Sequence, residues 1–215
     1  MATERHQSGI TTPKEKSTSG DAASRPERVD PWLSMLREHA QIKNGEKILD
    51  IIVSENSHKN YLQYEDGSFD AVIGNQVIQF FHYKKQLLRE VIRILKPKGR
   101  LVLNVFSRIE LCPCHLAVLQ ALIEQGGEIE EFRTPFSLYD PMELGDLVAD
   151  SGFKEISVVR KTHEERFGSI KDFISTLHLS SDVAEIVWSD YLKDFIDADG
   201  LRVLTTSNFL FARVS

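Results

Sequence analysis

The sequence predicts an α/β fold built around a mostly parallel sheet, and three stretches lead to this prediction. Residues 69–75 read FDAVIGN, a run whose apolar centre is typical of a strand buried on both faces. Residues 83–95, YKKQLLREVIRIL, place leucine, valine and isoleucine at helical spacing. Residues 100–106, RLVLNVF, form another apolar run. A strand–helix–strand unit of this kind needs a crossover, which makes its two strands parallel.

The elements before this unit are a helix and a strand. The helix follows VDPWLSMLREHAQI, in which Asp30 can cap the first turn and Pro31 suits its first position. Its apolar face contains Trp32 and Leu36. Residues 47–53 are expected to form a strand, and the polar stretch 54–68 a loop.

Further elements alternate after residue 106. Pro97 and Gly99 in KPKG act as stop signals for the preceding helix. We expect helices over 114–127 and 140–153, a strand over 154–167, helices over 169–177 and 180–196, and a closing strand over 201–215.

The N-terminal 28 residues contain no aromatic and almost no apolar side chain. Such a composition cannot bury enough surface to offset its ordering entropy, so we expect a disordered tail before one domain over 29–215. A transit peptide or a phosphorylated docking arm is the alternative. Acidic residues count against a transit peptide: Glu4, Glu15, Asp21 and Glu27.

Charge and composition restrict the function classes. The chain of 215 residues has a net charge of −6 and a pI near 5.7, which argues against a general nucleic-acid binder. No apolar run approaches the roughly 20 residues that span a bilayer, and no secretory signal is evident. Two cysteines one residue apart form no disulfide framework. An intracellular, cytoplasmic protein is expected.

Four stretches together resemble one family. They are GEKILDI at 45–51, YEDGSFDAVIGNQVIQFF at 64–81, LLREVIRILKPKGRLVLNVF at 87–106 and FSLYDPMELGDLVADSGFKEISV at 136–158. The second is similar to the family pattern DGSFD.V, and the third to L.E..RVLKPGG.L. The family is the Rossmann-like (class I) S-adenosylmethionine-dependent methyltransferases, especially the ubiquinone/menaquinone-biosynthesis type. The resemblance covers roughly 29–215 and implies a three-layer sandwich.

The chain departs from the family where the methyl donor should bind. In the family the first strand ends in a loop like D.G.G.G, and the second strand carries an acid for the ribose. Here Asp50 matches the acid of the loop, but Ile52 and Ser54 stand where glycines should follow. A long stretch of family sequence is missing between Ile51 and His58. The resemblance therefore implies a sheet without the family's second and third strands, in which the first strand is an edge paired with the fourth.

The missing glycines matter because the donor lies against bare backbone N–H groups at a strand-to-helix turn, which only glycine allows. Each lost charge-assisted hydrogen bond costs roughly 1.5–3 kcal/mol. We therefore expect the isolated chain to bind no S-adenosylmethionine. The deletion is tolerable for the fold, because residues 53–68 exceed the minimum of about a dozen needed for a crossover.

Candidate site residues lie beyond the strand ends, where ligands gather in open α/β sheets. The resemblance gives cofactor contacts to four polar residues, all of which can equally be loop or capping groups: Asp50, Asn75, Gln76 and Gln79. His82 and Tyr83 are weak catalytic candidates, since a histidine there can act as a base but no acid stands at a telling spacing.

Other polar and aromatic stretches have simpler interpretations. CPCH, residues 112–115, lacks the second ligand pair that a zinc site needs, and is interpreted as a helix start with buried thiols. The charge run 161–166 is interpreted as a solvated strand or loop. Core or interface roles are expected for three aromatic residues at helical spacing: Trp188, Tyr191 and Phe195.

Three functions remain open. The first is a catalytically inactive methyltransferase homologue that acts as a scaffold or partner subunit. The second is an active methyltransferase on a small molecule whose donor site is atypical or completed by a partner chain. The third is a small-molecule binder or non-methylating enzyme that uses the remaining cavity. We expect a protein partner or homo-oligomer, or the helix near Trp32, to cover the new sheet edge.

Overall fold

The computed structural model describes residues 30–52, 62–177, 179 and 188–215. Its centre is a six-stranded sheet with the order β1-β2-β3-β6-β4, and β5 pairs antiparallel with β6. The β1–β2 and β2–β3 pairs are parallel, which confirms the expected α/β class. The strands are β1 Ile48–Ile51, β2 Phe69–Asn75, β3 Leu95–Phe106, β4 Lys154–Phe167, β5 Ile196–Asp197 and β6 Gly200–Arg213.

The chain divides into two compact units. Among the described residues, unit 1 comprises those up to 104, 142–158 and 209–215, and unit 2 comprises those within 105–141 and 159–208. The strands β3, β4 and β6 continue from one unit into the other. The predicted tail, residues 1–28, lies outside the described residues, so the boundary expected at residue 29 stays a prediction.

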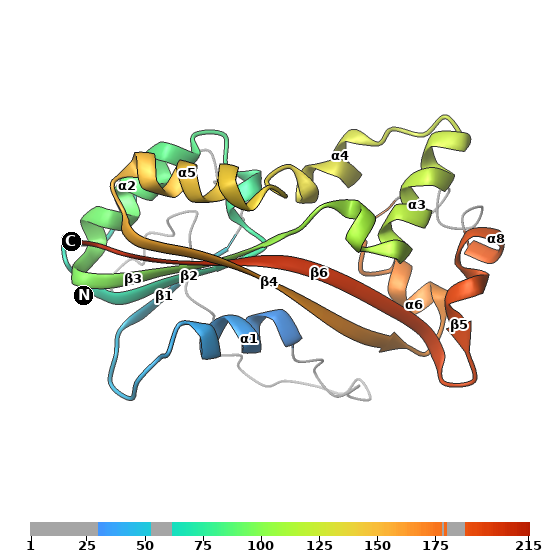
Figure 1. The fold of residues 1–215 in the computed structure, drawn as a ribbon, viewed down its shortest axis with the longest axis horizontal. Coiled ribbons are helices and arrows are strands. Elements are labelled where there is room, and N and C mark those ends of the chain that lie inside the picture. Colours follow the sequence, from blue (N-terminus) through green and yellow to red (C-terminus); the bar gives the residue numbers. More distant parts are fainter. Residues whose placement is uncertain (1–29, 53–61, 178, 180–187) are drawn as a thin grey trace, which may run out of the picture. The chain divides into compact units, whose positions relative to one another are not determined.

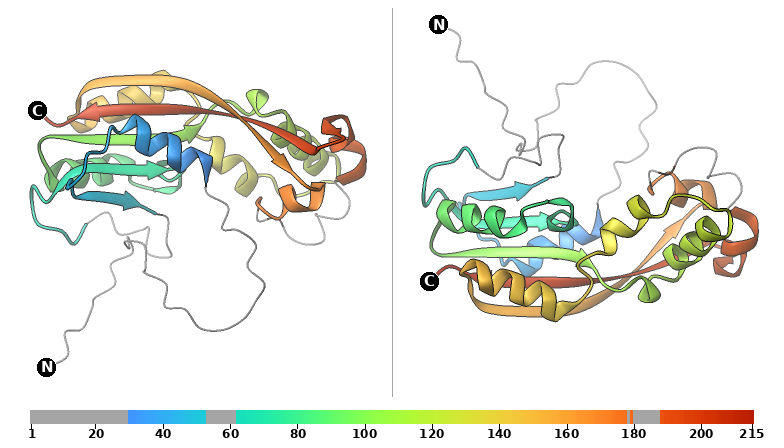
Figure 2. Two further views of the ribbon diagram at one scale, coloured as in Figure 1. Left: turned by 90° about the horizontal axis from the view of Figure 1, so that it is seen from below. Right: turned by 90° about the horizontal axis from the view of Figure 1, so that it is seen from above.

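Unit 1 has three layers. Helix α1, Pro31–His39, covers one face of the sheet, while α2, Lys84–Ile94, and α5, Pro141–Ser151, lie on the other (Figures 1 and 2). Helical spacing predicted an inward face with Leu87, Leu88 and Val91, and all three side chains are fully buried. Ile94 is buried as well, whereas Ile92, which the spacing also included, is only partly buried. A short 3-10 helix, η1 Ile78–Phe80, follows β2.

Helix α1 forms where the sequence predicted it. The Asp30 carboxylate caps the helix by accepting from the backbone N–H of Trp32 at 2.8 Å, and Pro31 occupies the first turn. Trp32 and Leu36 are buried, and the Trp32 ring lies 5.8 Å from the ring of Phe209 on β6. Helix α1 thus covers an apolar face of the sheet, as the sequence analysis expected of the helix near Trp32.

Strand β1 is an edge strand paired with β2. Leu49 is in register with Val72, and Asp50 with Ile73. This is the arrangement expected if the family's second and third strands are lost. Among the described residues no strand pairs with the other side of β1.

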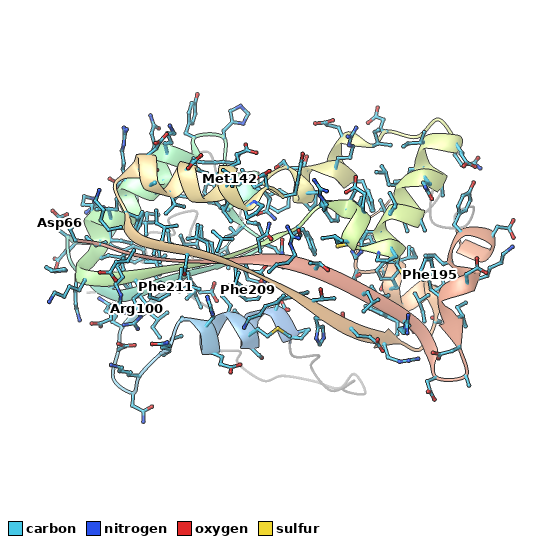
Figure 3. All side chains as sticks on the ribbon, in the orientation of Figure 1. Asp66, Arg100, Met142, Phe195, Phe209 and Phe211 are labelled. Atoms are coloured by element: carbon cyan, nitrogen blue, oxygen red, sulfur yellow. The ribbon has the colours of Figure 1, made fainter. Side chains whose placement is uncertain are left out.

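An ion pair anchors the segment that leads into β1. Arg100 of β3 is buried, and its guanidinium donates to both oxygens of Glu46, at 3.0 and 2.5 Å. Its Nε also donates to the carbonyl of Ala40 at 3.1 Å, just after α1. The hydrogen bonds from Arg100 lower the pKa of Glu46. One side chain therefore joins β3, the end of α1 and the entry to β1 (Figure 3).

The junction between α2 and β3 corrects the predicted boundaries. The helix ends at Ile94 and the strand begins at Leu95, whereas the sequence predicted a strand from residue 100. Pro97 explains the difference, because the residue before a proline is forced into extended backbone. Lys98 has a φ of 64°, and a Cβ on Gly99 would lie 2.7 Å from the Lys96 carbonyl oxygen. The KPKG stretch is thus an irregular start of the strand.

Unit 2 is built from short helices around its own core. In the part of unit 2 that the structure describes, the helices are η2 Ile109–Leu111, α3 Pro113–Glu124, α4 Glu130–Arg133, η3 Thr134–Phe136, α6 Ile170–Ile174, α8 Trp188–Leu192 and η4 Lys193–Phe195. Val118 and Leu122 of α3 are buried against Phe173 of α6 and Leu201 of β6. The sequence did not predict α4. Across the described residues, no helix has the length and apolarity to cross a membrane.

We predict that Lys98→Gly stabilises the protein by about 0.5–1 kcal/mol, because the left-handed backbone at this position disfavours any side chain with a Cβ. The unfolding free energy from urea denaturation measures this gain. Lys98→Ala removes the same charge but keeps the Cβ, so it should give no gain. Equal stability of the glycine and alanine variants would contradict a strained backbone.

Candidate functional site

The predicted polar residues at the strand ends come together in unit 1. Asn75 is the last residue of β2, Gln76 follows it, and Gln79 lies in η1. The end of the neighbouring strand β3 adds Asn104, which is in register with Asn75 and fully buried. Because parallel strands end at the same edge of a sheet, residues 28 or 29 positions apart meet there.

These four amides form one continuous chain of hydrogen bonds. Gln79 donates to the Gln76 side chain at 3.1 Å, and Gln76 donates to Asn104 at 2.7 Å. Asn104 in turn donates to the Asn75 side chain at 3.1 Å, and Asn75 donates to the carboxylate of Asp30 at 2.6 Å. We call this set the amide chain. It runs from the exposed N-cap of α1 to the buried Gln79.

The Asp30 carboxylate determines the direction of the amide chain. A carboxylate can only accept hydrogen bonds, so the Asn75 amide must turn its NH₂ group toward Asp30 and its oxygen toward Asn104. Each following amide must likewise turn its NH₂ group toward the oxygen of the amide before it. Asp30 is held in place because its other oxygen caps α1.

Gln79 is the end of the amide chain and retains an unsatisfied acceptor. Its side chain is 3% exposed, and Oε1 has no hydrogen-bond partner among the described residues. The backbone also holds Gln76 in place, because its N–H donates to the Asn104 carbonyl at 2.9 Å. Gln76 itself has a φ of 50°. The cluster is therefore fixed by backbone and side chains together.

Asp50 lies apart from the amide chain. It is half-buried in β1, and burial raises the pKa of its carboxyl while the charge of Arg37 lowers it. The described residues form no hydrogen bond to its side chain. Ile52, which directly follows the strand, is 40% exposed. A branched apolar side chain thus stands at the exit of β1.

His82 and Tyr83 precede α2 and do not join the candidate site. Both side chains are exposed, and their rings lie 5.7 Å apart. In the described part of the chain His82 forms no hydrogen bond with a carboxylate. The geometry assembles no acid–base pair around them.

Sequence reasoning missed Asp30 and Asn104 as members of the site. Asp30 was predicted only as a helix cap, and Asn104 was included in an apolar strand. An asparagine in RLVLNVF was the available signal, because a buried amide needs hydrogen-bond partners.

Residues 112–115 belong to the core of unit 2, as predicted. Both thiols are buried, and burial raises the pKa of Cys112 to about 11 and of Cys114 to about 12. His115 is enclosed by the rings of Phe106, Phe136 and Phe173, at 5.7, 5.8 and 5.3 Å. Within the described residues, no three His, Cys, Asp or Glu side chains gather in a metal-binding geometry.

The remaining sequence interpretations concern unit 2. Residues 161–166 lie in β4, where Arg166 pairs with Asp197 at 2.5 Å. Tyr191 and Phe195 are partly buried against the core, which confirms their predicted packing role. The side chain of Trp188 lies outside the described part of the chain.

Comparison with known proteins confirms the resemblance. Residues 20–103 match the model of a methyltransferase domain family. Over 110 residues the chain is 24% identical to a malonyl-[acyl-carrier protein] O-methyltransferase of Paenibacillus sp. (strain JDR-2), covering 51% of this chain and 39% of the relative. Over 136 residues it is 24% identical to phosphoethanolamine N-methyltransferase 1 of Arabidopsis thaliana, covering 63% and 24%. The chain thus matches well under half of each relative's length.

A solved structure has the same fold. A candidate methyltransferase from Bacillus halodurans C-125 superimposes with a TM-score of 0.53 at 15% identity, covering 86% of this chain and 99% of the other. The likeness supports the Rossmann-like methyltransferase architecture of the sheet and its helices.

We predict that Asn104→Ala lowers the unfolding free energy by about 1–3 kcal/mol, because it leaves partners in Gln76 and Asn75 unpaired. Urea denaturation measures the loss. A double-mutant cycle with Gln76→Ala should give a coupling energy of about 0.5 kcal/mol or more.

The control for this prediction is Gln120→Ala, which removes an exposed amide of α3 and should change stability by less than about 0.5 kcal/mol. An Asn104→Ala variant as stable as this control would contradict the structural role of the amide chain.

We predict that His115 makes stability depend on pH between about 4 and 6.5. Burial lowers the pKa of His115 to about 4, below its ordinary value of 6.5. The unfolded chain therefore takes up a proton in this range while the folded chain does not. Its contribution to stability is complete above pH 6.5 and is lost as the pH falls toward 4, by about 1.4 kcal/mol per unit.

Thermal or urea unfolding across this range tests the prediction. His115→Leu should flatten the profile, whereas His82→Gln, which removes an exposed imidazole, should leave its slope unchanged. A wild-type slope that persists in His115→Leu would refute the assignment.

Proposed function

We propose that this chain, which has the fold and the sequence match of a Rossmann-like methyltransferase, binds no S-adenosylmethionine by itself and acts as a binding or scaffolding subunit. The exit of β1 carries the proposal. The sequence has no glycine between Gly45 and Gly67, and Ile52 stands exposed directly after the strand. A branched side chain there prevents the close approach of a ligand to the backbone N–H groups.

The side chains at the ends of β2 and β3 also fit S-adenosylmethionine poorly. Asn75, Gln76 and Asn104 each donate and accept a hydrogen bond within the amide chain. S-adenosylmethionine would have to break these hydrogen bonds and replace each of them. Among the described residues, Gln79 Oε1 has no hydrogen-bond partner and the Asp50 carboxylate accepts no hydrogen bond. The resemblance implies more contacts to S-adenosylmethionine than these two groups supply.

A protein partner or a second copy of the chain is part of the proposal, as is a cytoplasmic location. The support is the edge position of β1, whose backbone groups are available for pairing on one side among the described residues. Apolar side chains exposed in the same unit add to it: Ile52, Phe80 and Tyr83.

The alternative is an active methyltransferase whose donor site a partner chain completes. Asp50 favours it, since a half-buried carboxylate at the strand exit is placed where the family's loop begins. The reaction would be transfer of a methyl group to an oxygen, nitrogen or carbon nucleophile, with catalysis mostly from positioning.

Calorimetric titration of S-adenosylmethionine into the purified chain tests the proposal. We expect no saturable binding up to about 1 mM, which corresponds to a binding free energy weaker than about −4 kcal/mol. Circular dichroism of the same sample confirms that the protein is folded.

Micromolar binding would overturn the proposal and favour the active enzyme. In that case Asp50→Asn should abolish the heat of binding. The matched control is Asp146→Asn, which removes an exposed carboxylate of α5 that forms no ion pair in the described structure. Binding that survives both changes would place the donor away from β1.

A further inference from the structure

Unit 2 contains a cavity that is independent of the amide chain. Its volume is about 500 Å³, and its walls come from the 105–141 segment, including η2, α3, α4 and η3. This volume lies within the range of about 300–1,000 Å³ that is common for small-molecule pockets.

Charged groups of both signs line the cavity without pairing. Arg108, Arg133, Glu110 and Glu130 all contribute to its wall. Across the described residues none of the four forms an ion pair within 4 Å. The guanidinium of Arg108 lies 5.9 Å from the centre of the Tyr139 ring. A guanidinium over a ring keeps its N–H edge available for an anionic ligand.

Apolar residues also line the cavity, and they are firmly held. Leu119 and Phe136 are buried, and the Phe136 ring stacks on Phe106 with centroids 4.9 Å apart at 22°. The backbone at Tyr139 is fixed because its carbonyl accepts from the buried Asn208 side chain at 2.6 Å. An apolar group of a ligand would therefore meet a surface that is already ordered, which lowers the entropic cost of binding.

We propose that this cavity binds a small zwitterion with an apolar or aromatic body, that is, a molecule with one anionic and one cationic group. A ligand with a single charge would meet like charges as well as opposite ones, since two arginines and two glutamates share the wall. A zwitterion can place its anionic group at an arginine and its cationic group at a glutamate. The apolar body then contacts Phe136 and Leu119.

The test uses three probes of nearly the same shape. L-phenylalanine carries both charges, 3-phenylpropionate only the anion, and 2-phenylethylamine only the cation. Titration of each into the full chain, followed by NMR chemical shifts or calorimetry, gives the dissociation constants. We expect L-phenylalanine to bind at least about fivefold more tightly than either single-charge probe.

Two double variants separate the contributions of the charges. Arg108→Gln with Arg133→Gln should weaken L-phenylalanine and 3-phenylpropionate about five- to tenfold and leave 2-phenylethylamine unweakened. Glu110→Gln with Glu130→Gln should weaken L-phenylalanine and 2-phenylethylamine instead. Lys171→Gln, which removes an exposed charge of α6 outside the cavity, should change none of the three. Circular dichroism confirms that each variant is folded.

Three results would overturn the inference. They are no saturable binding of L-phenylalanine up to about 10 mM, binding of 3-phenylpropionate or 2-phenylethylamine as tight as that of L-phenylalanine, and unchanged affinities in folded double variants. None of these results bears on S-adenosylmethionine binding, because the cavity and the exit of β1 involve separate residues.

Discussion

The hydrogen bond from Asn75 to the Asp30 carboxylate is the contact on which the candidate site depends. Since a carboxylate only accepts, this bond determines which way each amide from Asn75 to Gln79 is turned. It also joins the first turn of α1 to the end of β2. The helix that covers the sheet and the polar groups at its edge are therefore positioned by the same residue.

The sheet retains its core although its first strand is an edge. β1 contributes four residues and pairs with β2 alone among the described strands, so its entry needs support from elsewhere. Arg100 supplies this support by binding Glu46 and the carbonyl that follows α1. Trp32 and Leu36 bury the face beneath. Together these contacts stabilise a Rossmann-like sheet whose first strand is an edge among the described strands.

The two units differ in how their polar groups are used. In unit 1 the amides at the strand ends donate to one another, and Gln79 Oε1 is left without a partner among the described residues. In unit 2 four charged side chains line a cavity and form no ion pair in the described structure.

The sequence by itself determined the elements that depend on local patterns: the capped helix at Asp30, the buried strand 69–75, the amphipathic α2 and the buried thiols. Helical spacing and capping involve residues only a few positions apart, so they can be recognised in the sequence alone. Only the tertiary structure decided that Asn104 meets Asn75 and Gln76, that Gln79 is buried with a free acceptor, and that Arg108 and Arg133 share one cavity. Strand register and helix packing bring these groups together from distant positions, and no local pattern encodes that meeting.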